Sequence, residues 1–100
     1  MAQPEVLSAD VVDEQLAARG LHWVREEAEL VRSVRRADFA GALVVVNAVG
    51  ALAEAAEHHP DIDIRWNTVT LRLTTHSAGG LTRLDLDLAR RIDTLSGPGG

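Results

Sequence analysis

Three of the four histidines in this chain of 100 residues fall within one window, from Glu54 to Asp85. They are the adjacent pair His58 and His59, and His76. Imidazole exchanges protons near neutral pH, so imidazoles around one pocket suit a reaction that needs an acid and a base together. The carboxylates of Glu54 and Asp85 could orient the rings. The spacing alone leaves three readings open: acid/base catalysis, metal binding, and histidines with a structural role.

Of these three readings, metal binding fits the adjacent pair His58 and His59 less well than acid/base catalysis. We expect His58 and His59 at the end of a helix, where neighbouring side chains point about 100° apart around the axis. One ion is then difficult for both rings to reach.

The composition narrows the classes of partner and compartment. Ten Lys and Arg against fifteen Asp and Glu give a net charge of -5, which argues against direct nucleic-acid binding. The chain has no cysteine, which excludes disulfides and thiolate chemistry and fits a reducing compartment. The first residues have neither the basic nor the apolar segment of a signal peptide. We expect a cytoplasmic protein.

The elements that must position the histidines begin with three helices. Each has a residue at its start whose side chain can accept a hydrogen bond from the first turn. The predicted helices are 9–19 after Ser8, 39–58 after Asp38, and 83–95 after Thr82. Gly20 and Pro60 stop the first two.

The middle helix is apolar nearly all round for its first three-quarters. The run is too short to span a membrane, and Asn47 interrupts it. A helix this apolar is buried on more than one side. One side can pack on a sheet, and the other predicts contact with another subunit, in a homodimer or homotetramer.

The remaining segments predict two hairpins. The first has strands 21–26 and 29–35, and the second pairs the segment around Ile62 and Ile64 with strand 69–76 across a turn at Trp66-Asn67. In the last strand the apolar residues alternate with polar ones, and His76 ends the polar side. The predicted fold is α+β, in the order α-β-β-α-β-β-α, with three helices on one face of a four-stranded antiparallel sheet. We expect a domain of residues 7–95 between a flexible lead, 1–6, and a flexible tail, 96–100.

The window also carries a family resemblance. It reads Glu54, three residues, His58-His59-Pro60, five residues, Trp66, nine residues, His76, eight residues, Asp85. This resembles the signature of the pterin-4a-carbinolamine dehydratases, also called 4a-hydroxytetrahydrobiopterin dehydratases. Similar flanking positions are Leu7-Ser8-Ala9, Trp23, Asp38-Phe39 and Thr74-Thr75-His76. The segment 61–65 departs from the family, whose members often carry aromatic residues there, and this could alter pterin preference.

The resemblance implies loss of water from a 4a-hydroxytetrahydropterin, giving a quinonoid dihydropterin for tetrahydrobiopterin recycling, with no metal or redox cofactor. It implies His58, His59 and His76 as the acid/base set, Asp85 and Glu54 as orienting residues, and Trp23 and Trp66 as pterin-binding residues. We place His59 and His76 nearest the departing hydroxyl and His58 at the ring, while the identity of acid and base stays open.

Simpler roles exist for several of these residues. Asp85 can cap a helix, Glu54 can be a solvated surface residue, Trp23 can be core, and Trp66 can pack at a turn. A second function class is a non-catalytic dimerisation or binding module, because family members can act as dimerisation cofactors for a transcription regulator. The intact histidine set favours the enzyme.

Overall fold

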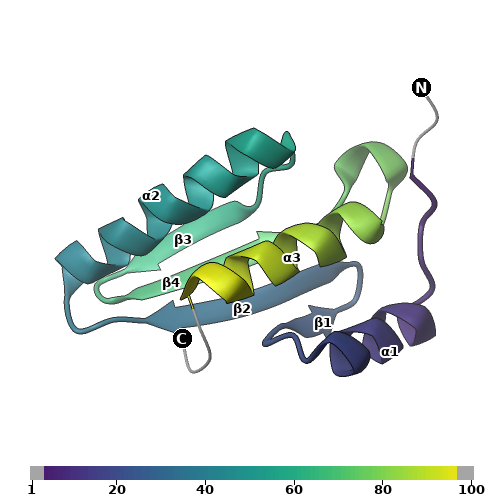
Figure 1. The fold of residues 1–100 in the computed structure, drawn as a ribbon, viewed down its shortest axis with the longest axis horizontal. Helices are drawn as coiled ribbons and strands as arrows, with labels where there is room; N and C mark the ends of the chain where they lie inside the picture. Colours follow the sequence, from purple (N-terminus) through teal and green to yellow (C-terminus); the bar gives the residue numbers. More distant parts are fainter. Residues whose placement is uncertain (1–3, 97–100) are drawn as a thin grey trace.

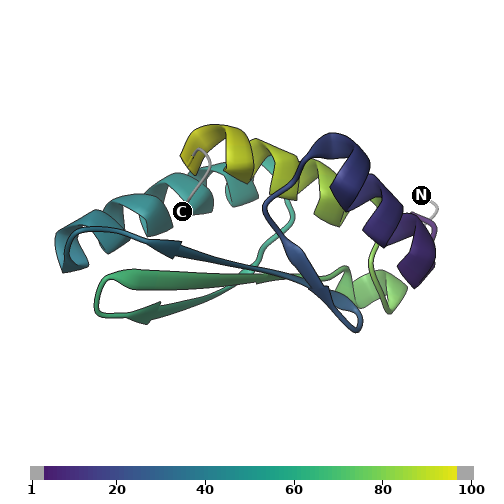
Figure 2. The ribbon, with the colours of Figure 1, turned by 90° about the horizontal axis from the view of Figure 1, so that it is seen from below.

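The structure, a computed structural model, describes residues 4–96. Three α-helices lie on one face of an antiparallel sheet with strand order β1-β2-β4-β3 (Figures 1 and 2). The elements are α1 (Ala9–Arg19), β1 (Val24–Glu26), β2 (Glu29–Arg35), α2 (Phe39–Ala56), β3 (Asp61–Arg65), β4 (Thr68–Leu73), the 3-10 helix η1 (His76–Ala78) and α3 (Arg83–Ser96). The predicted order and α+β class are confirmed. Residues 1–3 and 97–100, which hold parts of the predicted lead and tail, lie outside the described residues.

Side chains cap the first two helices as the sequence predicts. The Ser8 hydroxyl accepts a hydrogen bond from the Val11 N–H at 3.2 Å, and the Asp38 carboxylate accepts one from the Gly41 N–H at 2.8 Å. Each bond satisfies a backbone donor that has no partner inside its helix. α1 ends at Arg19 and is followed by Gly20, whose φ of 62° is the left-handed conformation that glycine adopts readily.

The end of α2 differs from the prediction. The helix stops at Ala56, and Glu57 takes the left-handed position with φ of 51°. The predicted end at His58 is therefore wrong by two residues. Because the chain turns out of the helix at Glu57, His58 and His59 are not successive helical residues, and the angle expected between them does not apply.

The second hairpin has the predicted two-residue turn at Trp66-Asn67, between the paired residues Arg65 and Thr68. Alternate residues of β4 are buried toward the helices, as predicted, and they are Val69, Leu71 and Leu73. β4 ends at Leu73, however, so the prediction of a strand reaching His76 is wrong. Beyond it Thr75 is buried and bridges to Gly80, while His76 starts η1.

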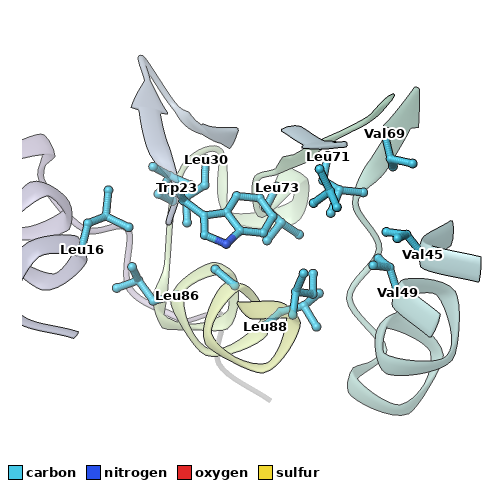
Figure 3. Packing of buried hydrophobic residues seen from close by; sticks show 14 of the residues in the cluster. Leu16, Trp23, Leu30, Val45, Val49, Val69, Leu71, Leu73, Leu86 and Leu88 are labelled. Atoms are coloured by element: carbon cyan, nitrogen blue, oxygen red, sulfur yellow. The ribbon is translucent and has the colours of Figure 1, made fainter. Parts of the chain in front are cut away.

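The core lies between the sheet and the helices, and the Trp23 ring is part of it (Figure 3). Trp23 is 5% exposed, and its indole N–H donates to Asp93 on α3 at 2.7 Å. The same carboxylate pairs with the buried Arg32 of β2 and accepts the His22 N–H at 2.7 Å. β1 begins at Val24, three residues later than predicted, after this anchored segment.

Only one face of α2 is buried in the single chain. Its buried residues are Ala42, Val45, Val49 and Ala53. On the other side Leu43 is 39% exposed and Val44 is 68% exposed. By length and composition this helix could cross a membrane, so the expectation that it is too short is wrong on that test. In the fold it packs on β2, β4 and α3.

Candidate active site

Three histidines from two segments line one pocket of about 300 Å³. His58 and His59 follow α2, and His76 begins η1. The other lining residues are Glu57, Thr74, Thr75 and Ser77. The β3–β4 register brings the segments together: Asp61 pairs with Arg72, so the residues before β3 lie beside those after β4. Figure 1 shows the end of α2 and η1 at the same end of the molecule.

His58 is held by a buried carboxylate. Its Nε2 lies 2.6 Å from Asp85 Oδ1, and the side chains are 10% and 0% exposed. The other oxygen, Oδ2, accepts the Thr82 N–H at 2.9 Å and the Thr75 hydroxyl at 2.7 Å. Asp85 therefore does two things at once: it caps the start of α3 and it fixes the ring of His58.

His59 has its own carboxylate, in a more open setting. Its Nε2 lies 2.5 Å from Glu54 Oε2, and the side chains are 60% and 78% exposed. The left-handed turn at Glu57 lets the ring fold back onto the last turn of α2. Within residues 4–96, the exposed His76 side chain makes no hydrogen bond or ion pair. The pocket therefore combines two carboxylate-bound imidazoles with one imidazole free to meet a ligand.

The two tryptophans do not line this pocket in the single chain. Trp23 is in the core, as the simpler reading of the sequence had it. Trp66 is 67% exposed, in the turn at the other end of β4 (Figure 1). Pterin binding by either residue stays a prediction.

Sequence reasoning missed Thr75 and Ser77 as members of the site. Thr75 lies within the run Thr74-Thr75-His76, which shaped the family resemblance. The alternation of the predicted strand, with His76 on its polar side, places Thr75 on the buried side, and this signal could have found it. Thr82, by contrast, was found as a helix cap. Among residues 4–96, no group of three or more His, Asp or Glu side chains is arranged to hold a metal ion.

Comparison with known proteins gives one consistent family. The model for pterin 4 alpha carbinolamine dehydratase matches residues 5–95. A relative from Chloroflexus aurantiacus, named as a pterin-4-alpha-carbinolamine dehydratase, is 54% identical over 91 residues, which cover 91% of this chain and 97% of the relative. A relative of the same name from Nocardia farcinica is 55% identical over 74 residues, covering 74% of this chain and 78% of the relative.

Solved structures share the fold. A crystal structure of a "transcriptional coactivator/pterin dehydratase" from Brucella melitensis has a TM-score of 0.83 and 31% identity, covering 93% of this chain and 100% of that one. A pterin dehydratase-like protein described as a RuBisCO assembly factor in the alpha-carboxysome has a TM-score of 0.61 over 77% of this chain and 89% of its own. Its 22% identity makes it a likeness of fold alone.

Proposed function

The chain belongs to the pterin 4 alpha carbinolamine dehydratase family, a family of dehydratase enzymes, and we propose that its pocket histidines dehydrate a 4a-hydroxytetrahydropterin. The reaction would serve tetrahydrobiopterin recycling in the cytoplasm. The single observation that carries the proposal is the convergence of His58, His59 and His76 on one pocket, although His76 is distant from the other two along the chain.

The reaction is a proton-balanced elimination. The proton on N5 passes to a base, the N5 electron pair forms the C4a=N5 double bond, and the C4a–O bond breaks. The departing hydroxyl takes a proton from an acid and leaves as water. Nothing is oxidised or reduced, so an acid and a base placed on either side of the C4a–N5 bond are sufficient.

The site offers imidazoles that can serve as the base and as the acid of this elimination. A ring with one nitrogen bound to a carboxylate can take up a proton on its other nitrogen, because the carboxylate stabilises the positive charge that results. His58 and His59 have this arrangement, with Asp85 and Glu54 as orienting residues. His76 also lines the pocket, and its ring can contact the substrate directly.

Self-association would cover two exposed features of the chain, the unpaired edge of β3 and the Trp66 side chain. β3 is an edge strand of the sheet, and an unpaired edge can accept another strand. Its sequence is complementary to itself in antiparallel pairing about Asp63. Asp61 would face Arg65 of the partner subunit, and Ile62 would face the partner's Ile64. Arg65 is also 3.1 Å from Asp63 in its own chain, which offsets the repulsion between the two central carboxylates.

This pairing would bring an aromatic ring to the pocket. In the same register the partner subunit's Trp66 would face Pro60, next to His59. An exposed tryptophan that is remote from the pocket in one chain would then border the pocket of the other. We propose this as the route by which Trp66 reaches the pterin, in a homodimer, or in a homotetramer if α2 also pairs.

A binding module is the second candidate function. The observation that favours it is the exposed apolar side of α2, with Leu43 and Val44. The Brucella melitensis structure is titled as both coactivator and dehydratase, so one chain of this fold is described in both terms. Leu43 and Val44 lie in the first half of α2, whereas the pocket histidines follow its last residue, so partner binding through α2 is compatible with an intact histidine pocket.

Kinetics test the dehydratase directly. The carbinolamine is generated in place, and its decay is followed with and without protein. We expect acceleration by the wild type, and a loss of about 100-fold or more in kcat for His59→Ala and His76→Ala. His22→Ala is the matched control, since His22 is exposed and outside the pocket. Absence of acceleration by the wild type, or full activity in both pocket variants, would refute the proposal.

A further inference from the structure

A chain of buried hydroxyl groups lies behind His58, and helix capping explains only part of it. Thr75 is 3% exposed, and Thr82 and Asp85 are 0% exposed. The cap of α3 needs Thr82 and Asp85, because these two satisfy the free N–H groups of its first turn. Thr75 comes from the segment after β4 and contributes nothing to the cap. Its hydroxyl is nevertheless bonded to both residues.

The direction of every proton in this chain can be worked out. The Leu84 N–H donates to the Thr82 hydroxyl oxygen at 3.2 Å, and the Thr75 hydroxyl donates to Asp85 Oδ2 at 2.7 Å. Thr75 has one hydroxyl proton and has already used it. In the 2.8 Å contact between the two hydroxyls, Thr82 must therefore donate to Thr75. Each donor in the series points toward the carboxylate, and each bond polarises the next.

Two donors on Oδ2 determine what Asp85 can do with Oδ1. Donors stabilise the ionised carboxylate, which accepts hydrogen bonds and donates none. The 2.6 Å contact with His58 then requires a proton on Nε2 of the ring. Nδ1 makes no hydrogen bond with any residue in 4–96, and it is the nitrogen left to exchange a proton in the pocket.

We propose that Thr75 is a positioning residue: its hydroxyl, oriented by Thr82, holds Asp85 as an acceptor and so leaves Nδ1 of His58 as the working nitrogen. The proposal rests on the proposed dehydratase function of the pocket. The backbone supports the role, because the Thr75 N–H donates to the Gly80 carbonyl at 3.1 Å and fixes the residue in place. The side chain acts through Asp85 and does not touch the substrate.

The ring tautomer is the first readout, and it needs neither substrate nor variant. Two-bond 1H–15N correlation spectra of the 15N-histidine-labelled full chain are recorded as the pH is raised until His58 is neutral. His58→Asn identifies its signals by their loss. We expect the proton of the neutral ring on Nε2. A proton on Nδ1 would mean that Asp85 is the donor, and it would overturn the proposal.

Thr75→Val removes the hydroxyl while keeping the shape. We expect kcat to fall about tenfold or more, the size expected when one hydrogen bond to a charged group is lost, with KM little changed. We also expect the Nε2–H signal of the neutral His58 ring to shift in this variant, because one of the two donors that hold Asp85 is lost. Thr75→Ser restores the hydroxyl and should return both readouts toward the wild type.

Thr70→Val is the matched control, because its hydroxyl is also bonded, to Ser33 at 3.0 Å, but on β4 and away from the pocket. Wild-type kcat and an unchanged His58 Nε2–H signal in Thr75→Val would overturn the proposal. If Thr75→Val does not fold, the wild-type tautomer and the Thr75→Ser variant decide the matter. Lack of dehydratase activity in the wild type would refute the proposed function separately, since the tautomer is measured without turnover.

Discussion

Two substitutions of Asp85 should separate its structural contribution from its catalytic one. Asp85→Asn keeps the shape of the side chain, and its amide oxygen can still accept from the Thr82 N–H and the Thr75 hydroxyl. Its amide nitrogen would take the place of Oδ1, beside His58 Nε2. Two donors cannot share that contact, so the ring must move its proton to Nδ1. The pocket then loses both the charge and the correct tautomer.

The stability costs follow from the hydrogen bonds. In Asp85→Asn charge-assisted bonds become neutral ones, which we estimate to cost about 1 kcal/mol in all. In Asp85→Ala the helix cap is lost, at about 1 kcal/mol, and a buried N–H is left without a partner, at about 2 kcal/mol more. The expected losses in the free energy of unfolding are therefore about 1 and about 3 kcal/mol. Small domains have only about 5 to 15 kcal/mol in total.

Activity should not follow stability in this pair. Both variants should lose about 100-fold or more in kcat, because neither has a carboxylate to hold the His58 ring. Urea unfolding followed by tryptophan fluorescence gives the stabilities, and carbinolamine decay gives the rates. Asp87→Asn is the control on the same helix, as its 3.2 Å pair with Arg19 is at the surface and contributes little. Wild-type kcat in Asp85→Asn would refute the reasoning, and so would equal destabilisation by the two substitutions.

Two further predictions concern the fold and the assembly. Asp93→Ala removes the carboxylate that pairs with the buried Arg32 and should lower the free energy of unfolding by about 3 to 5 kcal/mol in urea titrations, and a loss under 1 kcal/mol would contradict the account of that pair. At the β3 edge, Asp61→Arg should weaken self-association about tenfold by repelling Arg65 of the partner subunit, and the double variant Asp61→Arg/Arg65→Asp should largely restore it, as measured by light scattering over a concentration series. A dimer indifferent to both changes would show that its interface lies elsewhere.

Local signals predicted most of the fold. Ser8 and Asp38 cap their helices as predicted, Trp66-Asn67 forms the hairpin turn, and Thr82 caps α3 together with Asp85. These features depend on residues close in sequence, for which backbone geometry and hydrogen-bonding capacity are sufficient information. The alternation along β4 was equally readable, since one face of that strand is buried.

What the sequence missed depends on contacts between distant residues or on uncommon backbone conformations. The turn out of α2 occurs at Glu57, where a left-handed glutamate could not be anticipated from residue preferences. The late start of β1 reflects Asp93, which is 70 residues away from Trp23. Thr75 is buried at the next inward position after Leu73 although β4 has ended, because the chain bridges to Gly80 there. No local pattern predicts that bridge.

A crystal structure of the protein with a bound dihydropterin tests the central claim most directly. The account predicts the bicyclic ring in the pocket of His58, His59 and His76, with imidazole nitrogens within hydrogen-bonding distance of N5 and of the site of the departing hydroxyl. A ring bound elsewhere, such as the groove beside Leu52 and Arg91, with the histidine pocket empty, would contradict it.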